Sequence, residues 1–346
     1  MSVAPPTKHK QQDKQATIAA YRQTRSIRET ARQVDIPYTS TRRILEKAGV
    51  LDEKPTAPRP HERPQFEDLK TVDMPWRKVL DFCTEGEEIY RKTRGGQEKA
   101  TVKIDSDRPI VICYSSDWHL GSASVSHDQW RRHVDTLLNT PNLYMIAVGD
   151  YVDNFLKFRS IMPVLEQIIP PRIQFDVLEK IFDEMIKNDK LLAASWGNHD
   201  DERMENEIGF SLVEKMLRNK VPYLGGQGLV TIETGDQKYS HLLTHKSRYQ
   251  SFLNKLHGAK RMYQLVWPAR IVVTAHTHNP DYETYFHYDT QNYLVKCGTF
   301  KDHDGYSARY WTQGRIGVPA LVFYPDRDEI VPFLRVDQAV KYANAL

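Results

Sequence analysis

The sequence predicts an α/β fold with two stacked sheets, preceded by a small all-α domain. In the middle of the chain, short apolar runs typical of buried strands alternate with amphipathic helices, and pairs of strands follow towards the C-terminus. That order is typical of a layered α/β domain. Three short helical patterns occupy the first 50 residues. We therefore expect a helical domain at residues 1–50, a linker at 51–74 and an α/β domain at 75–346.

The composition fits a soluble intracellular protein. A chain of 346 residues with 40% hydrophobic content has room for one large α/β core and a smaller domain. Its three cysteines are scattered and odd in number, which favours a reducing compartment. No apolar run approaches the roughly 18 residues of a membrane span, and no stretch resembles a signal peptide. We predict a cytoplasmic protein that does not contact membranes.

The helical domain contains a recognisable helix start. Ser26 and Glu29 form a Ser-x-x-Glu capping box, in which the two side chains satisfy backbone N–H groups at the first turn. A break follows at residues 35–37. The pattern predicts helices over residues 13–21, from Ser26 to about Val34, and from Thr39 or Ser40 to Ala48.

The segment SIRETARQVDIPYTSTRRIL resembles a helix-turn-helix of the resolvase or regulator type, with Asp35 in place of the usual turn glycine. The resemblance implies a DNA-reading helix that offers Thr39, Ser40, Arg42 and Arg43 to bases and phosphates. Residues 1–64 hold 13 Lys and Arg against 7 Asp and Glu, which favours DNA as a partner. The alternative is a helical hairpin for oligomerisation. A single unit would bind DNA weakly unless the chain forms a homo-oligomer.

Further elements follow in order. Prolines at residues 55, 58, 60 and 64 predict a stiff, extended linker. Pro75 opens a helix with Trp76 and Leu80 on one side, and residues 100–104 read as an edge strand. Apolar faces predict helices around residues 130–138, 175–185, 209–218 and 252–256, and strands at 282–288, 293–297, 319–324 and 329–335.

Five apolar runs end on metal-seeking side chains. Strand-like runs at residues 111–115, 144–148, 191–196, 241–244 and 270–274 lead into DWH, GDYVD, GNHD, a lone His and AHTH. Because open α/β sheets place their chemistry at the carboxyl ends of strands, we expect these side chains to meet at one sheet edge. Carboxylate and imidazole together suit Mn, Fe or Zn, whereas calcium prefers oxygen ligands. Seven oxygen and nitrogen ligands from these motifs would be enough for two divalent metal ions, with manganese as the first expectation.

These five ordered motifs resemble the calcineurin-like metallophosphoesterase superfamily over about residues 109–299, with Ala275 where the family usually has Gly. The resemblance implies a two-sheet sandwich of metallophosphoesterase type. It also implies that His199 donates a proton to the leaving oxygen and that Asp153 orients His199. The implied ligands are Asp117, His119 and His278 for one ion, a bridging Asp150, and Asn198, His245 and His276 for the second.

The motifs also bear on the substrate. GDYVD is similar to the phosphoprotein phosphatases, but Asn154 replaces the arginine with which that branch grips phosphate. SSDWHLGS with GNHDD resembles the SbcD-type DNA-repair exonuclease branch, without that branch's capping domain and ATPase-binding segment. We expect a DNA-cleaving phosphodiesterase in which a water made nucleophilic between two cations attacks the phosphodiester. The combination of a helix-turn-helix domain with a phosphoesterase domain would suit a phage or mobile-element protein. The alternatives are a DNA-binding regulator that hydrolyses or senses a small nucleotide or other phosphoester, and an adaptor with an inert site.

Overall fold

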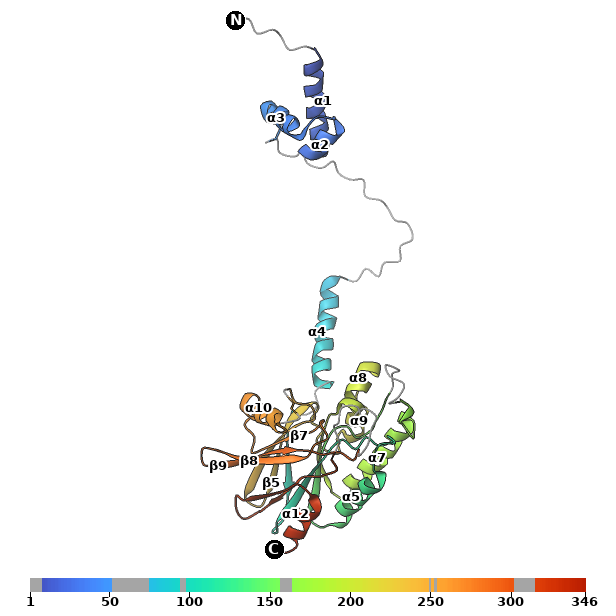
Figure 1. Cartoon of the computed structure of the whole chain (residues 1–346), viewed down its shortest axis with the longest axis vertical. Coiled ribbons are helices and arrows are strands. Elements are labelled where there is room, and N and C mark those ends of the chain that lie inside the picture. Colours follow the sequence, from blue (N-terminus) through green and yellow to red (C-terminus); the bar gives the residue numbers. More distant parts are fainter. Residues whose placement is uncertain are drawn as a thin grey trace. The chain divides into compact units, whose positions relative to one another are not determined.

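A computed structural model describes residues 8–51, 75–93, 98–155, 164–248, 250–251, 254–301 and 315–346. It divides into two compact units, Met1–Pro75 and Trp76–Leu346 (Figure 1). Of the predicted linker at 51–74, only Leu51 is among the described residues. Among the described helices, none combines the length and apolar character needed to cross a bilayer.

The described residues of the first unit form three helices, which are α1 (Lys8–Thr24), α2 (Ile27–Gln33) and α3 (Tyr38–Ala48). The predicted capping box is confirmed in part, because Ser26 Oγ accepts a hydrogen bond from Glu29 N at 3.4 Å. Tyr21, Leu45 and Val50 form the small buried core. At the turn between α2 and α3, Asp35 has φ +52°, a backbone conformation that aspartate tolerates better than most residues.

In the described part of the second unit, the strands form two sheets. One has the strand order β11-β10-β2-β3-β4 and the other β1-β5-β6-β7-β9-β8. The strands are β1 (Lys99–Ile104), β2 (Ile110–Ser115), β3 (Leu143–Val148), β4 (Leu191–Ser195), β5 (Gln227–Thr234), β6 (Gln237–Thr244), β7 (Ile271–Thr274), β8 (Asp281–His287), β9 (Thr290–Lys296), β10 (Ala320–Phe323) and β11 (Ile330–Phe333). The predicted two-sheet α/β class is therefore confirmed.

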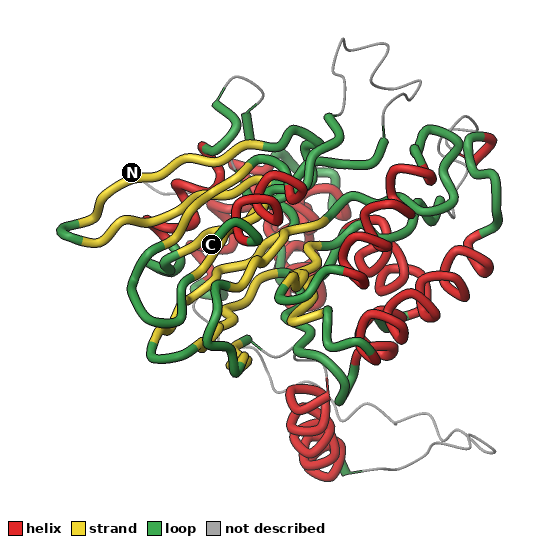
Figure 2. The backbone as a smooth tube through the Cα atoms, turned by 90° about the horizontal axis from the view of Figure 1, so that it is seen from below, coloured by secondary structure: helices red, strands yellow, loops and turns green. Residues whose placement is uncertain are grey.

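Helices cover the outer faces of the sheets (Figure 2). Helices α5, α7, α9 and α12 share a core with the five-stranded sheet, and α10 packs on the other sheet. The helices of this unit are α4 (Trp76–Thr93), α5 (His127–Asn139), α7 (Pro171–Lys187), α8 (Arg203–Ile208), α9 (Leu212–Leu217), α10 (His257–Leu265) and α12 (Val336–Ala343), with a π-helical turn η1 (Asn198–Glu202).

The strands that lead into the predicted ligands are buried on both faces. In β2, Val111 and Cys113 belong to the core under the helices, whereas Ile112 and Tyr114 belong to the core between the sheets. Because a slip of one residue would exchange these faces, the register of such a strand is strongly fixed. The carboxyl end of β2 therefore delivers the next residues to a defined place.

Several sequence expectations need correction. The five ligand-bearing strands do not end at one sheet edge, because β2, β3 and β4 lie in one sheet and β6 and β7 in the other. The helix expected at 252–256 begins instead at His257, and residues 252 and 253 lie outside the described part. The side of α4 with Trp76 and Leu80 is exposed rather than packed. Strand β5 and helix α12 were not predicted.

Candidate active site

Two loops that follow β2 and β3 run side by side at the end of the sheet. Asp117 N donates to the carbonyl of Gly149 at 3.1 Å, and His119 N donates to the carbonyl of Asp150 at 3.1 Å. Both aspartates and His119 have positive φ, between 45° and 55°. His276 also does, at 75°. Non-glycine residues rarely adopt this conformation, and where they do the strain often marks a functional site.

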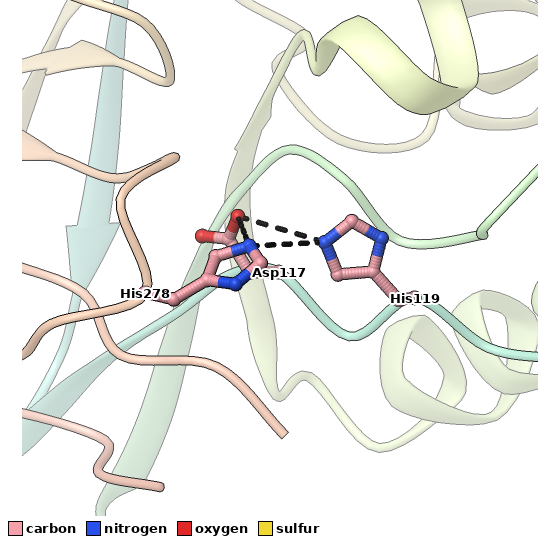
Figure 3. Close-up of side chains that lie close together, drawn as sticks. All are labelled: Asp117, His119 and His278. Atoms are coloured by element: carbon pink, nitrogen blue, oxygen red, sulfur yellow. Dashed lines mark hydrogen bonds and ion pairs between the residues drawn. The ribbon is translucent and has the colours of Figure 1, made fainter. Parts of the chain in front are cut away.

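The first ligand cluster consists of Asp117, His119 and His278 (Figure 3). Asp117 Oδ1 lies 3.0 Å from His278 Nε2 and 3.9 Å from His119 Nε2. The two imidazole nitrogens are 3.2 Å apart. The other carboxylate oxygen, Asp117 Oδ2, accepts hydrogen bonds from Ser116 Oγ and from His276 N. Asp117 is thus held by one oxygen and presents the other to the two histidines.

The second cluster consists of Asp150, His245 and His276. Asp150 Oδ1 accepts a hydrogen bond from His199 N at 2.8 Å. Its Oδ2 lies 3.1 Å from His245 Nε2 and 3.9 Å from His119 Nε2. The same oxygen therefore faces both clusters, as a bridging carboxylate must.

The ring of His245 is oriented by the main chain. His245 Nδ1 lies 2.7 Å from the carbonyl of Val148, which can only accept a hydrogen bond. Its Nδ1 therefore carries a proton, and Nε2 points to the cluster, as is usual for metal-binding histidines. Asn198, at the start of η1, has a buried Oδ1 for which the described residues offer no hydrogen-bond partner.

The donor atoms fit divalent cations. Metal–ligand bonds to nitrogen and oxygen of about 2.1 Å place neighbouring ligands roughly 3–3.5 Å apart, close to the spacing within the first cluster. Asp117 Oδ1, Asn198 Oδ1 and His245 Nε2 are buried and form no hydrogen bond of good geometry with the described residues, although other cluster members lie close to the first and the third. Since buried polar atoms are normally satisfied, these three atoms are suited to binding ions.

The charges around Asp150 favour a cation. Burial would raise the pKa of the Asp150 carboxyl, but His245 and His199 outweigh it and hold that pKa well below its usual value. Burial would likewise lower the pKa of His245, but Asp150 and Asp117 raise it to about 10. Burial, assisted by the charge of His245, lowers the pKa of His276 to about 4. Positive charge is therefore stabilised next to Asp150, and a bound cation would supply it in place of the second proton of His245. His276 is already neutral and would not have to lose a proton to bind the ion.

The model of the calcineurin-like phosphoesterase family matches residues 110–303, more than half of the chain. The chain belongs to this family. Its members use divalent metals, so this calcineurin-like phosphoesterase is a metal-dependent phosphoesterase whose Asp and His clusters can hold the ions. No curated protein matches the sequence.

Several solved structures have low similarity to this phosphoesterase. One is Vps29 with Zn²⁺ from Entamoeba histolytica, whose sequence is 12% identical. The match covers 65% of this chain and 97% of that chain, with a TM-score of 0.33. A predicted phosphoesterase from Streptococcus pneumoniae TIGR4 is 14% identical, with coverages of 66% and 100% and a TM-score of 0.31. The nuclease MPE from Pseudomonas putida is 15% identical, with coverages of 64% and 87% and a TM-score of 0.29.

The predicted proton donor of the phosphoesterase, His199, lies beside the first cluster, with its ring centroid 4.4 Å from that of His119. His199 Nδ1 lies 2.8 Å from the backbone carbonyl of Asp153 and 3.9 Å from its carboxylate. That carboxylate lies 3.2 Å from His119 Nδ1 and accepts a hydrogen bond from Lys301 at 3.2 Å. The main chain of Asp153 therefore orients His199, while its side chain stands beside a ligand.

The motifs did not reveal several residues that support this site. Ser116 Oγ lies 2.7 Å from Asp117 Oδ2, and Asp200 Oδ2 accepts a hydrogen bond from Tyr151 N at 2.6 Å. Both could have been found, because each adjoins a predicted ligand or proton donor. The contacts of Arg203 with the carbonyls of Asp153 and Asn154 could not, since they depend on how separate loops fold together.

Aromatic neighbours of the ligands serve the core of the phosphoesterase. Trp118 and Tyr151 are fully buried and pack on each other with ring centroids 5.0 Å apart, which leaves neither ring free to stack on a base. His241 is buried and lies within 3.0 Å of the Tyr114 hydroxyl, as expected of a core histidine. Ala275 is buried in the core between the sheets, and its backbone does not need the conformation that glycine would provide.

The residues predicted to contact DNA lie on α3. Thr39, Arg42 and Arg43 are exposed, and Ser40 is half-buried. Arg42 forms an ion pair with Glu46 at 2.8 Å. The helix thus presents two basic side chains to solvent, and DNA binding by them stays a prediction.

Proposed function

We propose that the protein is a two-metal phosphodiesterase that cleaves DNA. The observation that carries this proposal is the position of Asp150 between two ligand clusters, beside a histidine suited to proton transfer. When bound, two divalent cations, which we propose to be manganese, would neutralise phosphate charge and lower the pKa of a water molecule between them.

Residues of the chain would supply positioning and proton transfer. Asp117 and Asp150 each use one oxygen for a hydrogen bond and present the other to the clusters. His199 would give a proton to the leaving oxygen from Nε2, because its Nδ1 faces the Asp153 carbonyl. Lys301 adds positive charge close to the same place.

The N-terminal unit supports DNA as the substrate. Its basic excess and the exposed Arg42 and Arg43 of α3 would hold DNA through its phosphates. Tethered to the catalytic unit, such a module raises the local concentration of substrate. Since one small module binds weakly, we also propose that the chain acts as a homo-oligomer on DNA.

Cleavage of DNA tests the proposal directly. We expect manganese-loaded protein to cut end-labelled or circular DNA, and chelation to stop the reaction. His199→Ala should lower the rate by about 10²- to 10⁴-fold, the range typical of a lost proton donor. His287→Ala is the matched control, because His287 is an exposed histidine of β8, and the rate of this variant should equal that of the parent. Metal-loaded protein that leaves single- and double-stranded DNA intact contradicts the proposal. Hydrolysis of cyclic nucleotides alone would favour the small-nucleotide regulator.

Removal of residues 1–50 tests the role of the N-terminal unit. The truncated protein should bind DNA more weakly and with a flatter dependence on salt, yet hydrolyse bis(p-nitrophenyl) phosphate at the same rate. In the full chain, Arg42→Ala with Arg43→Ala should reduce the slope of log K against log salt by about 2, since each phosphate contact contributes roughly 0.9. Unchanged binding and slope would assign the unit to another role.

A further inference from the structure

We propose that Arg203 binds the substrate phosphate and thereby extends the site beyond its metal ligands. The inference rests on the proposed phosphodiesterase function and names a residue that recognises the substrate. Arg203 is the first residue of α8 and follows the π-helical turn η1, which begins at Asn198. It lies four positions after His199, so the two side chains lie on the same face of this helical segment.

Hydrogen bonds hold the guanidinium in place. Arg203 Nη1 donates to the carbonyl of Asp153 at 2.7 Å and to the carbonyl of Asn154 at 3.2 Å. The guanidinium carbon lies 4.1 Å from the centre of the Phe155 ring. A guanidinium fixed in this way loses little further conformational freedom when it binds a ligand.

The guanidinium also reaches the predicted proton donor. Arg203 Nη2 lies 3.1 Å from His199 Nε2, and Nη1 lies 2.9 Å from His199 Nδ1. Because Nδ1 donates to the carbonyl of Asp153, Nε2 of the neutral imidazole accepts a hydrogen bond from Arg203. That bond must break when Nε2 takes up the proton that it gives to the leaving oxygen. A phosphate whose leaving oxygen approaches Nε2 would therefore come within reach of the same guanidinium.

The direct partners of the Arg203 guanidinium among the described residues carry no negative charge. Its partners are two carbonyls, an imidazole and an aromatic ring, all of them uncharged, and within the described part of the chain no carboxylate forms an ion pair with it. Lys301 differs, because it is paired with Asp153. A half-buried guanidinium without a carboxylate is suited to an anion, and phosphate matches its fork of parallel N–H donors.

Phosphate binding by manganese-loaded protein tests the assignment without catalysis. Arg203→Gln keeps an amide donor for the two carbonyls but removes the charge. In isothermal titration calorimetry with inorganic phosphate, we expect its affinity to fall by about 10- to 100-fold, as for the loss of a charge-assisted hydrogen bond. Metal content, measured by elemental analysis, should not change. The control is Arg218→Gln, because Arg218 is exposed at the C-terminal end of α9 and pairs with Glu214. This variant protein should bind phosphate with the affinity of the parent.

Arg203→Lys provides the second comparison. It retains charge but not the planar fork, so its phosphate affinity should lie between those of the parent and Arg203→Gln. If Arg203→Gln does not fold, Arg203→Lys is compared with the parent alone, and about tenfold weaker binding is expected. Parent-like phosphate affinity in the metal-loaded variant would overturn the assignment. Absence of DNA cleavage by the parent protein, with intact phosphate binding through Arg203, would instead count against the proposed substrate.

Discussion

Replacing Asp150 by asparagine should leave the fold intact, reduce the metal content below two ions per chain and lower phosphodiesterase activity about a thousandfold. Asp150 Oδ1 accepts a hydrogen bond from His199 N, a role that an amide oxygen can keep. Its Oδ2 faces both His245 and His119, where the variant would present an uncharged NH₂ group that cannot bind a cation. Losing the several kcal/mol that a metal supplies in the transition state corresponds to roughly that factor.

The measurement combines elemental analysis with the rate on bis(p-nitrophenyl) phosphate, which does not depend on DNA binding. Asp183→Asn serves as the matched control, because Asp183 is exposed on α7 and pairs with Lys220. Its metal content and rate should equal those of the parent. An Asp150→Asn protein that holds two ions and keeps the parent rate would show that this carboxylate does not bridge the clusters.

The ends of the five strands could be predicted because local chemistry marks them. An apolar run followed by Asp, Asn or His is visible in the sequence, and the structure brings Asp117, His119 and His278 together as expected from the resemblance. Asp150, His245 and His276 likewise converge. The assignment of strands to two sheets could not be predicted, since β2 and β7 have similar apolar runs but lie in different sheets, and pairing partners are set by tertiary packing.

Some missed elements did carry a local signal. Residues 227–234 alternate buried and more exposed positions, and Gly235-Asp236 joins β5 to β6 as a two-residue hairpin turn. In the sequence, this alternation is visible as Val230 and Ile232 alternating with the polar residues Thr231 and Glu233. The contacts of Arg203 with the loop at 153–155 had no such signal, because they depend on the geometry of two loops distant in sequence.

Substituting alanine for Gly197 should destabilise the protein by about 1–3 kcal/mol, as overpacking of a tight contact typically does. A Cβ atom at Gly197 would overlap the backbone nitrogen of Asp150 and the carboxylate of Asp200, and would lie 2.7 Å from Asp150 Oδ1. The obstacles are mainly backbone and buried carboxylates, which cannot rotate away. Relief therefore requires the loops after β3 and β4 to separate.

Separation of these loops would move Asp150 away from Asn198, and a displacement of about 1 Å can reduce an enzyme's rate roughly 100-fold. We expect Gly197→Ala to lose part of its metal and most of its activity, measured by elemental analysis and hydrolysis of bis(p-nitrophenyl) phosphate. Gly86→Ala in α4 is the control, because nothing lies within 4 Å of a Cβ added there. If Gly197→Ala kept the parent's metal content and rate, close backbone contact between the loops would not be what positions the second ion. The site would then depend on its side chains alone.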